Sequence, residues 1–299
     1  MSWSAIKDKS FIPPTIQEYQ EKNPSPHRVE FGEKPKQSKS TRLSPLITVI
    51  TIVRNGGKTI EKTIQSVLSQ SYQNIEYIII DGASTDNTLQ MIEKYKDKIT
   101  YCLSEADSGI SDAFNKGIAC ASGDLIGLIN ADDWYEKDVL EKVAEQYSSA
   151  GPAIIYGKMK FWKGDKLQYV AAADHSKLVY NMSVNHPAVF VARKYYEDYG
   201  LFCLNLKIAM DYEWLRRASQ RGATFHYLNE VVSNMQLMGV SDTAWRKGCK
   251  ECFEIRRAQG MSATLNYATY LKALSKIYTR KFLERFRLQF LIRLYRSWH

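Results

Sequence analysis

The sequence predicts an α/β protein, in which a mostly parallel β-sheet is flanked by helices and followed by a C-terminal helical extension. Two observations lead to this fold class. A strand, a turn and a helix follow one another four times between residues 46 and 147. The strands are continuous apolar runs, which is typical of strands buried on both faces. Such alternation of strands and helices favours a parallel sheet with helices on both sides.

The first strand–turn–helix unit has the clearest pattern. Residues 46–53 are rich in β-branched side chains, and the turn residues Asn55-Gly56-Gly57 end the run. Apolar residues then recur at helical spacing, which predicts a helix over 59–70.

The next three units repeat this order. In the second unit, Ser84 or Thr85 is expected to cap a helix that carries Leu89, Ile92 and Tyr95. The expected strands cover 75–80, 99–103 and 124–129, and the last two helices cover 111–121 and 134–147.

Polar residues gather in the turns that follow these four strands. The turns span residues 54–57, 81–86, 104–109 and 130–133, and three of them are acidic. Because parallel sheets bind ligands at the carboxyl ends of their strands, we expect a site at this edge.

The segment Asn130-Ala131-Asp132-Asp133 is a candidate metal site. Adjacent carboxylates at a strand end repel each other unless a positive charge lies between them. Oxygen ligands suit Mg²⁺ or Mn²⁺ better than zinc. The alternative is that Asp132 or Asp133 caps a helix beginning at Trp134. The other acidic turns at the same edge favour the metal.

Asp81 is a candidate ligand for the base or the ribose of a nucleotide. It precedes Gly82 and is not placed to cap the following helix. A role as a turn-forming residue is the alternative.

The string from Thr48 to Asp133 resembles the nucleotide-binding half of the family-2 glycosyltransferases, which have the Rossmann-related GT-A fold. The resemblance implies transfer of a sugar from a nucleotide-diphosphate donor with inversion, assisted by Mn²⁺ or Mg²⁺. The matching segments are the first strand with Asn55, the turn Asp81-Gly-Ala-Ser-Thr-Asp86-Asn-Thr88, the run Gly109 to Gly117, the run Ala121 to Asp124, and Asn130-Ala-Asp132-Asp133.

The resemblance also implies which residues bind the donor and the metal. Three residues depart from the family pattern: Asn130 replaces an Asp, Arg54 a Tyr and Phe114 an Arg. We therefore expect Asp107, Asp112 and Lys116 to take over some of the donor contacts. The expected metal ligands are Asp132, Asp133 and His186. The expected donor site comprises Val53, Asn55, Asp81, Asp107, Asp112, Lys116, Asn130, Ala131 and Asp132.

The resemblance places the catalytic base in the second half of the chain. Asp211 matches the Asp of the family's acidic pair, while Met210 replaces the Glu. Glu213 is the second candidate. The alternative for Asp211 is a helix cap. His186 has a structural alternative too, and Trp162, Tyr169 and Trp214 could either stack on sugar rings or pack in the core.

Composition divides the chain into three parts. The first 45 residues hold six of the eight prolines, so residues 1–44 are read as a flexible arm. Residues 45–240 form the expected GT-A domain, with a nucleotide-sugar half at 45–135 and an acceptor half at 136–240. Residues 241–299 form a basic helical extension.

The extension carries most of the net charge of +9. From Lys272 to His299 there are eight Lys or Arg and one Glu, which gives +7. Phe282, Phe286, Phe290 and Leu294 lie on one helical stripe. Such a basic amphipathic helix suits an anionic membrane surface, and packing on the domain is the alternative. No nucleic-acid partner is expected, because the rest of the chain is nearly neutral.

These observations predict a cytoplasmic enzyme, peripheral on the inner face of the plasma membrane. The expected partners are a nucleotide-diphosphate sugar, with a UDP-sugar favoured, and a glycan or lipid-linked acceptor. Two alternatives remain at this point: a metal-dependent nucleotidyltransferase or phosphohydrolase, and a non-catalytic sugar-nucleotide-binding protein.

Overall fold

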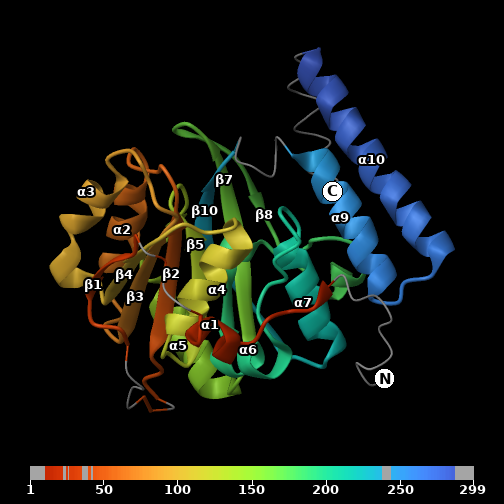
Figure 1. Cartoon of the computed structure of the whole chain (residues 1–299). Coiled ribbons are helices and arrows are strands. Elements are labelled where there is room, and N and C mark those ends of the chain that lie inside the picture. The colour runs from red at the N-terminus through yellow and green to blue at the C-terminus, as the bar shows by residue number, and fades with distance from the viewer. Residues whose placement is uncertain are drawn as a thin grey trace.

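A computed structural model describes residues 11–22, 25, 27–35, 40, 41, 43–237 and 244–286. Its centre is a ten-stranded mixed sheet with the strand order β1-β4-β3-β2-β5-β9-β7-β10-β6, to which β8 is added by pairing with β7 (Figure 1). The strands are β1 (Val29–Gly32), β2 (Ile47–Val53), β3 (Ile75–Asp81), β4 (Tyr101–Ser104), β5 (Leu125–Asn130), β6 (Trp134–Tyr135), β7 (Ile154–Lys163), β8 (Lys166–Ala171), β9 (Val189–Ala192) and β10 (Phe225–Gln236).

The first half of the sheet is parallel, as the repeated strand–helix units predict. β2 pairs in parallel with both β3 and β5, and β3 pairs in parallel with β4. β9 then enters antiparallel to β5 and β7, and β10 runs parallel to β7. The sequence-based fold class, a mostly parallel sheet flanked by helices, is confirmed.

Helices cover both faces of the sheet because side chains alternate along each strand. Ile50 and Ile52 of β2 belong to the core under α4, α6 and α7, whereas Val49 and Val53 belong to the core under α2 and α5. The helices are α1 (Ile16–Gln20), α2 (Ile60–Leu68), α3 (Thr88–Glu93), α4 (Ile110–Cys120), α5 (Val139–Ala150), α6 (Arg193–Tyr199), α7 (Met210–Gln220), α9 (Trp245–Ala258) and α10 (Ala263–Arg285).

The expected helix at Trp134 does not begin there. Trp134 and Tyr135 form the short strand β6, which pairs with Asn234 and Ser233 of β10, and α5 begins only at Val139. Neither Asp132 nor Asp133 can therefore cap a helix that starts at Trp134. Likewise, Asn87 rather than Ser84 or Thr85 is the N-cap residue of α3.

The segment before residue 45 is more regular than its composition suggests. In its described residues it forms α1 and then β1, which adds an antiparallel edge strand next to β4. Tyr19 of α1 is 7% exposed and belongs to the core under α4. In these described residues the segment pairs its backbone with an otherwise open sheet edge.

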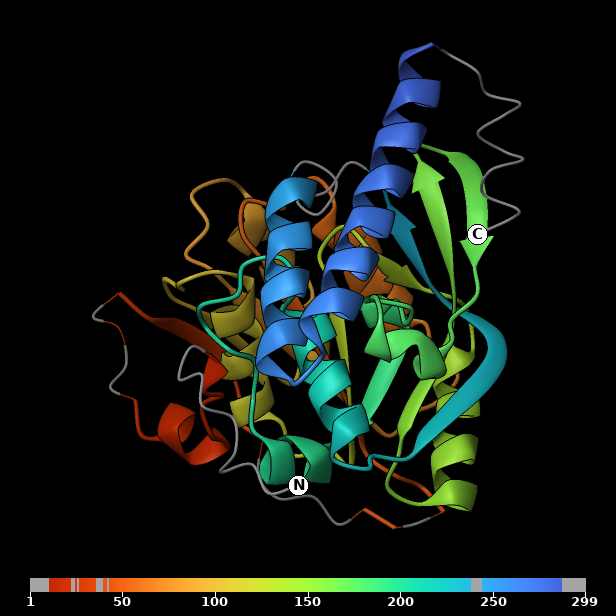
Figure 2. The same cartoon turned by 90° about the vertical axis from the view of Figure 1, so that its right-hand side faces the viewer.

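In its described residues, the C-terminal extension forms an antiparallel helix pair beside α7. α9 lies against α7, and α10 returns along α9 and projects beyond the body of the molecule (Figures 1 and 2). Phe253 of α9 contacts Tyr267 and Tyr270 of α10, and Trp245 contacts Tyr278. Along the described part of the chain, no helix combines the length and the apolar character needed to cross a membrane.

Candidate active site

The carboxyl ends of the parallel strands meet at one edge of the sheet. The N–H of Gly82 donates to the carbonyl of Val53 over 2.8 Å, and the N–H of Ala131 donates to the carbonyl of Ile52 over 3.2 Å. The N–H of Glu105 donates to the carbonyl of Asp81 over 3.0 Å. These bonds extend the strand pairing into the turns, so the four polar turns lie next to one another.

The turns after β2 and β3 are joined to each other. The N–H of Asn55 donates to Ser84 Oγ over 2.7 Å, and Asn55 Oδ1 accepts from the N–H of Thr85 over 2.8 Å. Asn55 and Ala83 both have a positive φ, 54° and 53°. Such backbone conformations cost about 1–3 kcal/mol each in non-glycine residues. The two joined turns, residues 54–57 and 81–86, therefore form a preorganised surface that we call the cradle.

Asp81 lies at the base of this cradle and is fully buried. Its carboxylate accepts hydrogen bonds from Ser104 Oγ at 2.6 Å, from the N–H of Ser84 at 3.0 Å and from Ser84 Oγ. These bonds fix the orientation of the carboxylate, and Ser84 then lies between Asp81 and Asn55.

Asp132 and Asp133 occupy different environments in the turn after β5. Asp132 is exposed, whereas Asp133 is 1% exposed and accepts from Asn130 Nδ2 at 3.1 Å. Among the described residues, no hydrogen-bond donor reaches Asp133 Oδ1. Burial, together with the neighbouring charge of Asp132, holds the pKa of Asp133 well above its usual range. A buried, unpaired carboxylate oxygen next to a second carboxylate fits a divalent cation.

The expected third metal ligand does not complete this pair. His186 lies in a short 3₁₀ turn next to β5, and its ring packs at 5.5 Å from that of Phe114 and 5.8 Å from that of Phe202. Burial lowers the pKa of His186 to about 4, so the imidazole is neutral. Within the described ranges, no group of three His, Cys, Asp or Glu side chains is close enough to bind a metal ion.

Asp107 lies at the same edge of the sheet, in contact with the turn after β3. Its Oδ1 accepts from the N–H of Gly109 at 2.8 Å, and a Cβ at Gly82 would collide with its carboxylate. Gly82 therefore permits this close approach. Burial raises the pKa of Asp107, and the charges of Lys116 and Arg54 oppose that shift. Arg54, which the sequence showed only as a departure from the family pattern, is thus a cation at this edge.

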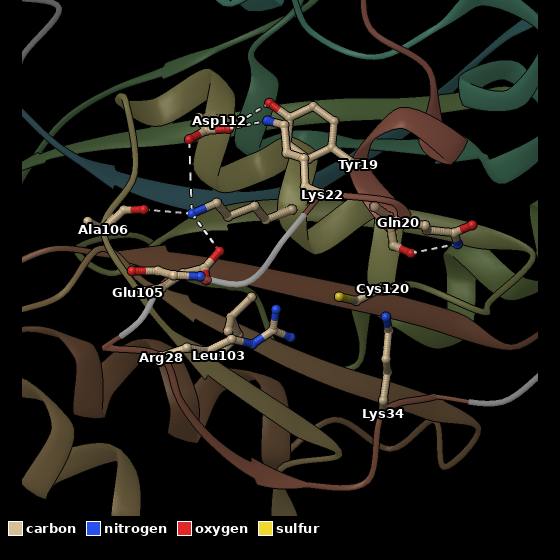
Figure 3. Close-up of a pocket in the computed structure, with 13 residues that line it drawn as sticks. Tyr19, Gln20, Lys22, Arg28, Lys34, Leu103, Glu105, Ala106, Asp112 and Cys120 are labelled. Atoms are coloured by element: carbon tan, nitrogen blue, oxygen red, sulfur yellow. Dashed lines mark hydrogen bonds and ion pairs between the residues drawn. The ribbon is translucent and has the colours of Figure 1, made fainter.

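Asp112 and Lys116 face the N-terminal segment instead. They line a pocket of about 240 Å³ between α4, β4 and α1 (Figure 3). Asp112 accepts from Tyr19 Oη at 2.6 Å and from Ser108 Oγ at 3.0 Å, and Lys116 Nζ lies 2.8 Å from Glu105 Oε1. Burial raises the pKa of Asp112, but these hydrogen bonds and Lys116 outweigh it and lower the pKa overall. We therefore leave both residues out of the proposed donor site.

Asp211 is the second residue of α7 and is partly buried. Ala209, not Asp211, is the N-cap residue, and Asp211 Oδ1 accepts from the N–H of Tyr212 at 2.7 Å. Burial raises the pKa of Asp211 to about 6, and the nearby charge of Glu251 adds to the shift. A carboxyl group with this pKa can act as a general base near neutral pH.

The loop before α7 reaches the edge of the sheet that carries the four polar turns. Lys207 Nζ donates to the carbonyl of Ser108 at 2.7 Å, and Ser111 Oγ donates to the carbonyl of Leu206 at 3.1 Å. The start of α7 is thereby joined to the turn between β4 and α4, which also carries Asp107.

Glu213 is bound in an ion pair on the buried side of the same helix. Its side chain is 1% exposed, and each of its oxygens lies 2.9 Å from a guanidinium nitrogen of Arg217. Gln259 Nε2 donates to Glu213 Oε1 at 3.1 Å. These contacts give Glu213 a structural environment and favour Asp211 as the base.

The three aromatic candidates have different surroundings. Trp214 is 1% exposed and donates to the carbonyl of Gly200, so it is a core residue. Tyr169 stacks on Phe161 with ring centroids 4.6 Å apart. Trp162 is partly exposed, contacts Trp134 and donates from Nε1 to Asn234 at 2.7 Å.

Comparison with known proteins identifies the family. The model of glycosyl transferase family 2 matches residues 48–217. TuaG of Bacillus subtilis (strain 168), which is named as a proposed glycosyltransferase of teichuronic acid biosynthesis, is 29% identical over 247 residues, covering 78% of this chain and 97% of TuaG. A PGL/p-HBAD biosynthesis glycosyltransferase of Mycobacterium bovis (strain BCG / Pasteur 1173P2) is 25% identical over 207 residues. The match covers 67% of this chain and 80% of that glycosyltransferase.

Solved structures show the same fold. TarS 1-349 of Staphylococcus aureus in complex with UDP has a TM-score of 0.59 at 18% identity, covering 78% of this chain and 72% of that one. This chain covers 39% of the chain in another TarS structure. The mannosyltransferase PcManGT of Pyrobaculum calidifontis, in complex with GDP-Man and Mn²⁺, has a TM-score of 0.56 at 18% identity, with coverages of 95% and 88%. With the family model spanning more than half of its residues, this chain belongs to glycosyl transferase family 2 and has a GT-A fold.

Proposed function

We propose that this glycosyltransferase moves a sugar from a UDP-sugar to a hydroxyl group of a glycan or lipid-linked acceptor, with inversion at the anomeric carbon. The observation that carries the proposal is the position of Asp211. Its carboxyl group, with a pKa raised to about 6, lies on α7, and the loop before α7 contacts the turn after β4 at the edge that carries the polar turns. TarS structures contain UDP and UDP-GlcNAc, which supports this donor class. The named roles of TuaG and the mycobacterial relative support cell-surface polysaccharide or glycolipid synthesis.

The proposed donor site is the cradle at the carboxyl ends of the strands. Asn55 and Asp81 would bind the nucleoside from the joined turns, with the backbone of Val53 beside them. Asn130, Ala131 and Asp132 would contact the ribose and the diphosphate, and Asp107 lies across the cradle beside Arg54. The sequence departures at Arg54 and Asn130 are consistent with a donor site built partly from the turn after β4.

Asp132 and Asp133 would hold a divalent cation, Mn²⁺ or Mg²⁺. PcManGT contains Mn²⁺ beside GDP-Man, and the unpaired Asp133 Oδ1 is suited to such a ligand. The cation supplies positive charge to the leaving diphosphate. With only these two carboxylates from the described residues, the remaining ligand positions would fall to the donor's phosphate oxygens and to water.

The proposed reaction is a single displacement. The acceptor oxygen forms a bond to the anomeric carbon while the bond from that carbon to the phosphate oxygen breaks. The electron pair of the broken bond leaves with the nucleoside diphosphate, and the proton of the acceptor hydroxyl moves to Asp211. Attack from the face opposite the leaving group inverts the anomeric centre.

We also propose that α10 binds an anionic membrane surface on the cytoplasmic side. Phe282 and Phe286 are each 58% exposed, and Tyr267, Leu271 and Tyr278 are exposed too. Lys272, Lys276 and Lys281 lie on the same helix. Exposed apolar residues interleaved with cations suit an interface with anionic lipid. Phe290 and Leu294 of the expected stripe lie outside the described residues.

The test is donor binding followed by transfer. Purified protein is heated with UDP-sugars and GDP-sugars, with and without Mn²⁺. A ligand at 100 times its Kd stabilises the folded state by about 2.7 kcal/mol, so the true donor raises Tm in a concentration-dependent way. The anomeric configuration of the product, read by NMR, then reports inversion or retention. A retained configuration, or stabilisation by no nucleotide sugar, would contradict the proposal.

A further inference from the structure

We infer that Glu251 of α9 is a positioning residue for Asp211, an inference that rests on the proposed function of Asp211. Glu251 is 6% exposed, and it belongs to the C-terminal extension rather than to the residues that the family model matches. Its carboxylate reaches across to the loop that leads into α7. The extension thereby takes part in building the catalytic centre.

The contact between Glu251 and the loop consists of three hydrogen bonds from consecutive backbone amides. Glu251 Oε1 accepts from the N–H of Lys207 at 3.1 Å, and Oε2 accepts from the N–H groups of Ile208 and Ala209, each at 2.9 Å. Ala209 is the N-cap residue of α7 and has no side-chain oxygen of its own. Glu251 therefore accepts, from another helix, the N-cap N–H group that the Glu of a capping box would bind, together with the two N–H groups before it.

A glycine in α9 permits this contact. Gly248 lies one turn before Glu251, and a Cβ at Gly248 would approach Ile208 Cγ2 to 3.0 Å. Glycine thus lets α9 come close enough for the Glu251 carboxylate to reach the loop amides. At the C-terminal end of α9, Gln259 donates to both the carbonyl and the carboxylate of Glu213 in α7. The segment from Glu251 to Gln259 therefore contacts both the loop before α7 and the first turn of α7.

This contact fixes the direction in which Asp211 leaves the backbone, since the bound amides end two residues before it. Glu251 also places a second negative charge near Asp211. The Cys252 thiol of α9 also interacts electrostatically with Asp211, and the charges of Arg216 and Arg256 act on the neighbouring Tyr212. Loss of the Glu251 charge should favour the ionised form of Asp211 and at the same time loosen its position.

The test compares Glu251→Gln and Glu251→Ala with the control Glu254→Gln. Glu254 lies one turn further along α9, partly exposed and paired with Lys250. We expect kcat to fall roughly 10- to 100-fold in Glu251→Ala, with donor KM unchanged, because small displacements of a reacting group are costly. The acid limb of the kcat profile should move to lower pH in both Glu251 variants, and Glu254→Gln should match the wild type in both respects.

A stability role alone would lower Tm without moving the acid limb or kcat, and that outcome would overturn the inference. Hydrogen exchange of the amides of Lys207, Ile208 and Ala209 provides a readout that needs no activity. Faster exchange there in Glu251→Ala supports the contact even if the wild type fails to transfer a sugar, in which case the proposed function fails. Unchanged exchange would refute the contact itself.

Discussion

Asp211 and Glu213 stand two residues apart on α7 in opposite environments. Asp211 is partly buried, with a pKa raised to about 6, whereas Glu213 is enclosed and paired with Arg217. The sequence offers both as bases, because spacing alone does not show which face of a helix meets the core. Once the packing of α7 is known, the buried ion pair leaves Asp211 as the candidate.

Asp211→Asn should keep donor affinity and lose turnover by about 10²–10⁴. The side chain is nearly isosteric, so the change removes the base and little else. In the wild type, kcat should fall as pH drops through about 6, because protonation of Asp211 removes the base. Transfer rates and donor KM between pH 5 and 8 provide the measurement. Near-normal turnover in Asp211→Asn would rule out the assignment.

The same substitution has a consequence for stability. A carboxyl group whose pKa is higher in the folded than in the unfolded state destabilises the folded state once it ionises. That penalty is complete above about pH 6 and disappears below the unfolded pKa near 4. Asp211→Asn should therefore raise Tm at pH 8 and leave it nearly unchanged at pH 4. A pH-independent change in Tm would contradict this account.

Asp132→Ala should abolish the Mn²⁺-dependent part of donor binding. Asp132 is exposed on a turn, so the fold should survive its truncation. The measurement is the Tm shift caused by a UDP-sugar with and without Mn²⁺, compared between wild type and variant. Asp138→Ala, a change in a partly exposed Asp six residues further along, is the control. An unchanged Mn²⁺ effect in Asp132→Ala would place the cation elsewhere.

At the scale of elements, α9 and α10 pack against different parts of the molecule. Glu251 of α9 binds the loop before α7, Ile255 belongs to the core under α7, and Gln259, just after α9, binds Glu213. α10 packs on α9 through aromatic contacts and leaves a row of apolar side chains exposed. The basic, apolar composition of the tail predicted a surface helix but could not show that another helix lies between it and the catalytic domain. The exposed row is the feature of α10 on which the membrane proposal rests.

The double substitution Phe282→Ser and Phe286→Ser should reduce binding to anionic vesicles. Both rings are exposed, and their centroids lie 4.7 Å apart. The folded domain should therefore lose little stability when they are removed. The measurement is co-sedimentation with phosphatidylglycerol-containing vesicles. Leu167→Ser with Val170→Ser, a similarly exposed apolar pair on β8, is the matched control. Equal sedimentation of both double variants would contradict the membrane proposal.

At the scale of the whole molecule, the sequence predicted the parts whose signals are local. The apolar runs gave the strands of the first half of the sheet, and parallel pairing then placed the four polar turns at one edge. Contacts between distant segments were not predictable in this way. Examples are β6 at Trp134, which depends on pairing with β10 a hundred residues later, and the Glu251 contact with the 207–209 loop. Glu251 lies between two cysteines and resembles an ordinary surface residue of a helix.

The N-terminal segment is the clearest case of a long-range contact, because α1 reaches α4 across more than ninety residues of sequence. Tyr19 Oη donates to Asp112 Oδ1 at 2.6 Å, and Asn115 Nδ2 donates to Tyr19 Oη at 3.3 Å. Burial, followed by the hydrogen bond to Asp112, raises the pKa of Tyr19 well above its usual range, so this phenol remains a donor. Tyr19 thus satisfies a carboxylate that our sequence analysis assigned to the donor site.

Tyr19→Phe separates these two roles of Asp112. If Asp112 anchors the N-terminal segment, the loss of its buried donor should lower the free energy of unfolding by about 1–3 kcal/mol while donor KM stays unchanged. If Asp112 contacts the donor, the lost hydrogen bond should change donor KM as well. Urea unfolding and donor kinetics on the full chain distinguish the outcomes, with Tyr267→Phe, an exposed tyrosine on α10, as the control. A raised KM with unchanged stability would return Asp112 to the donor site.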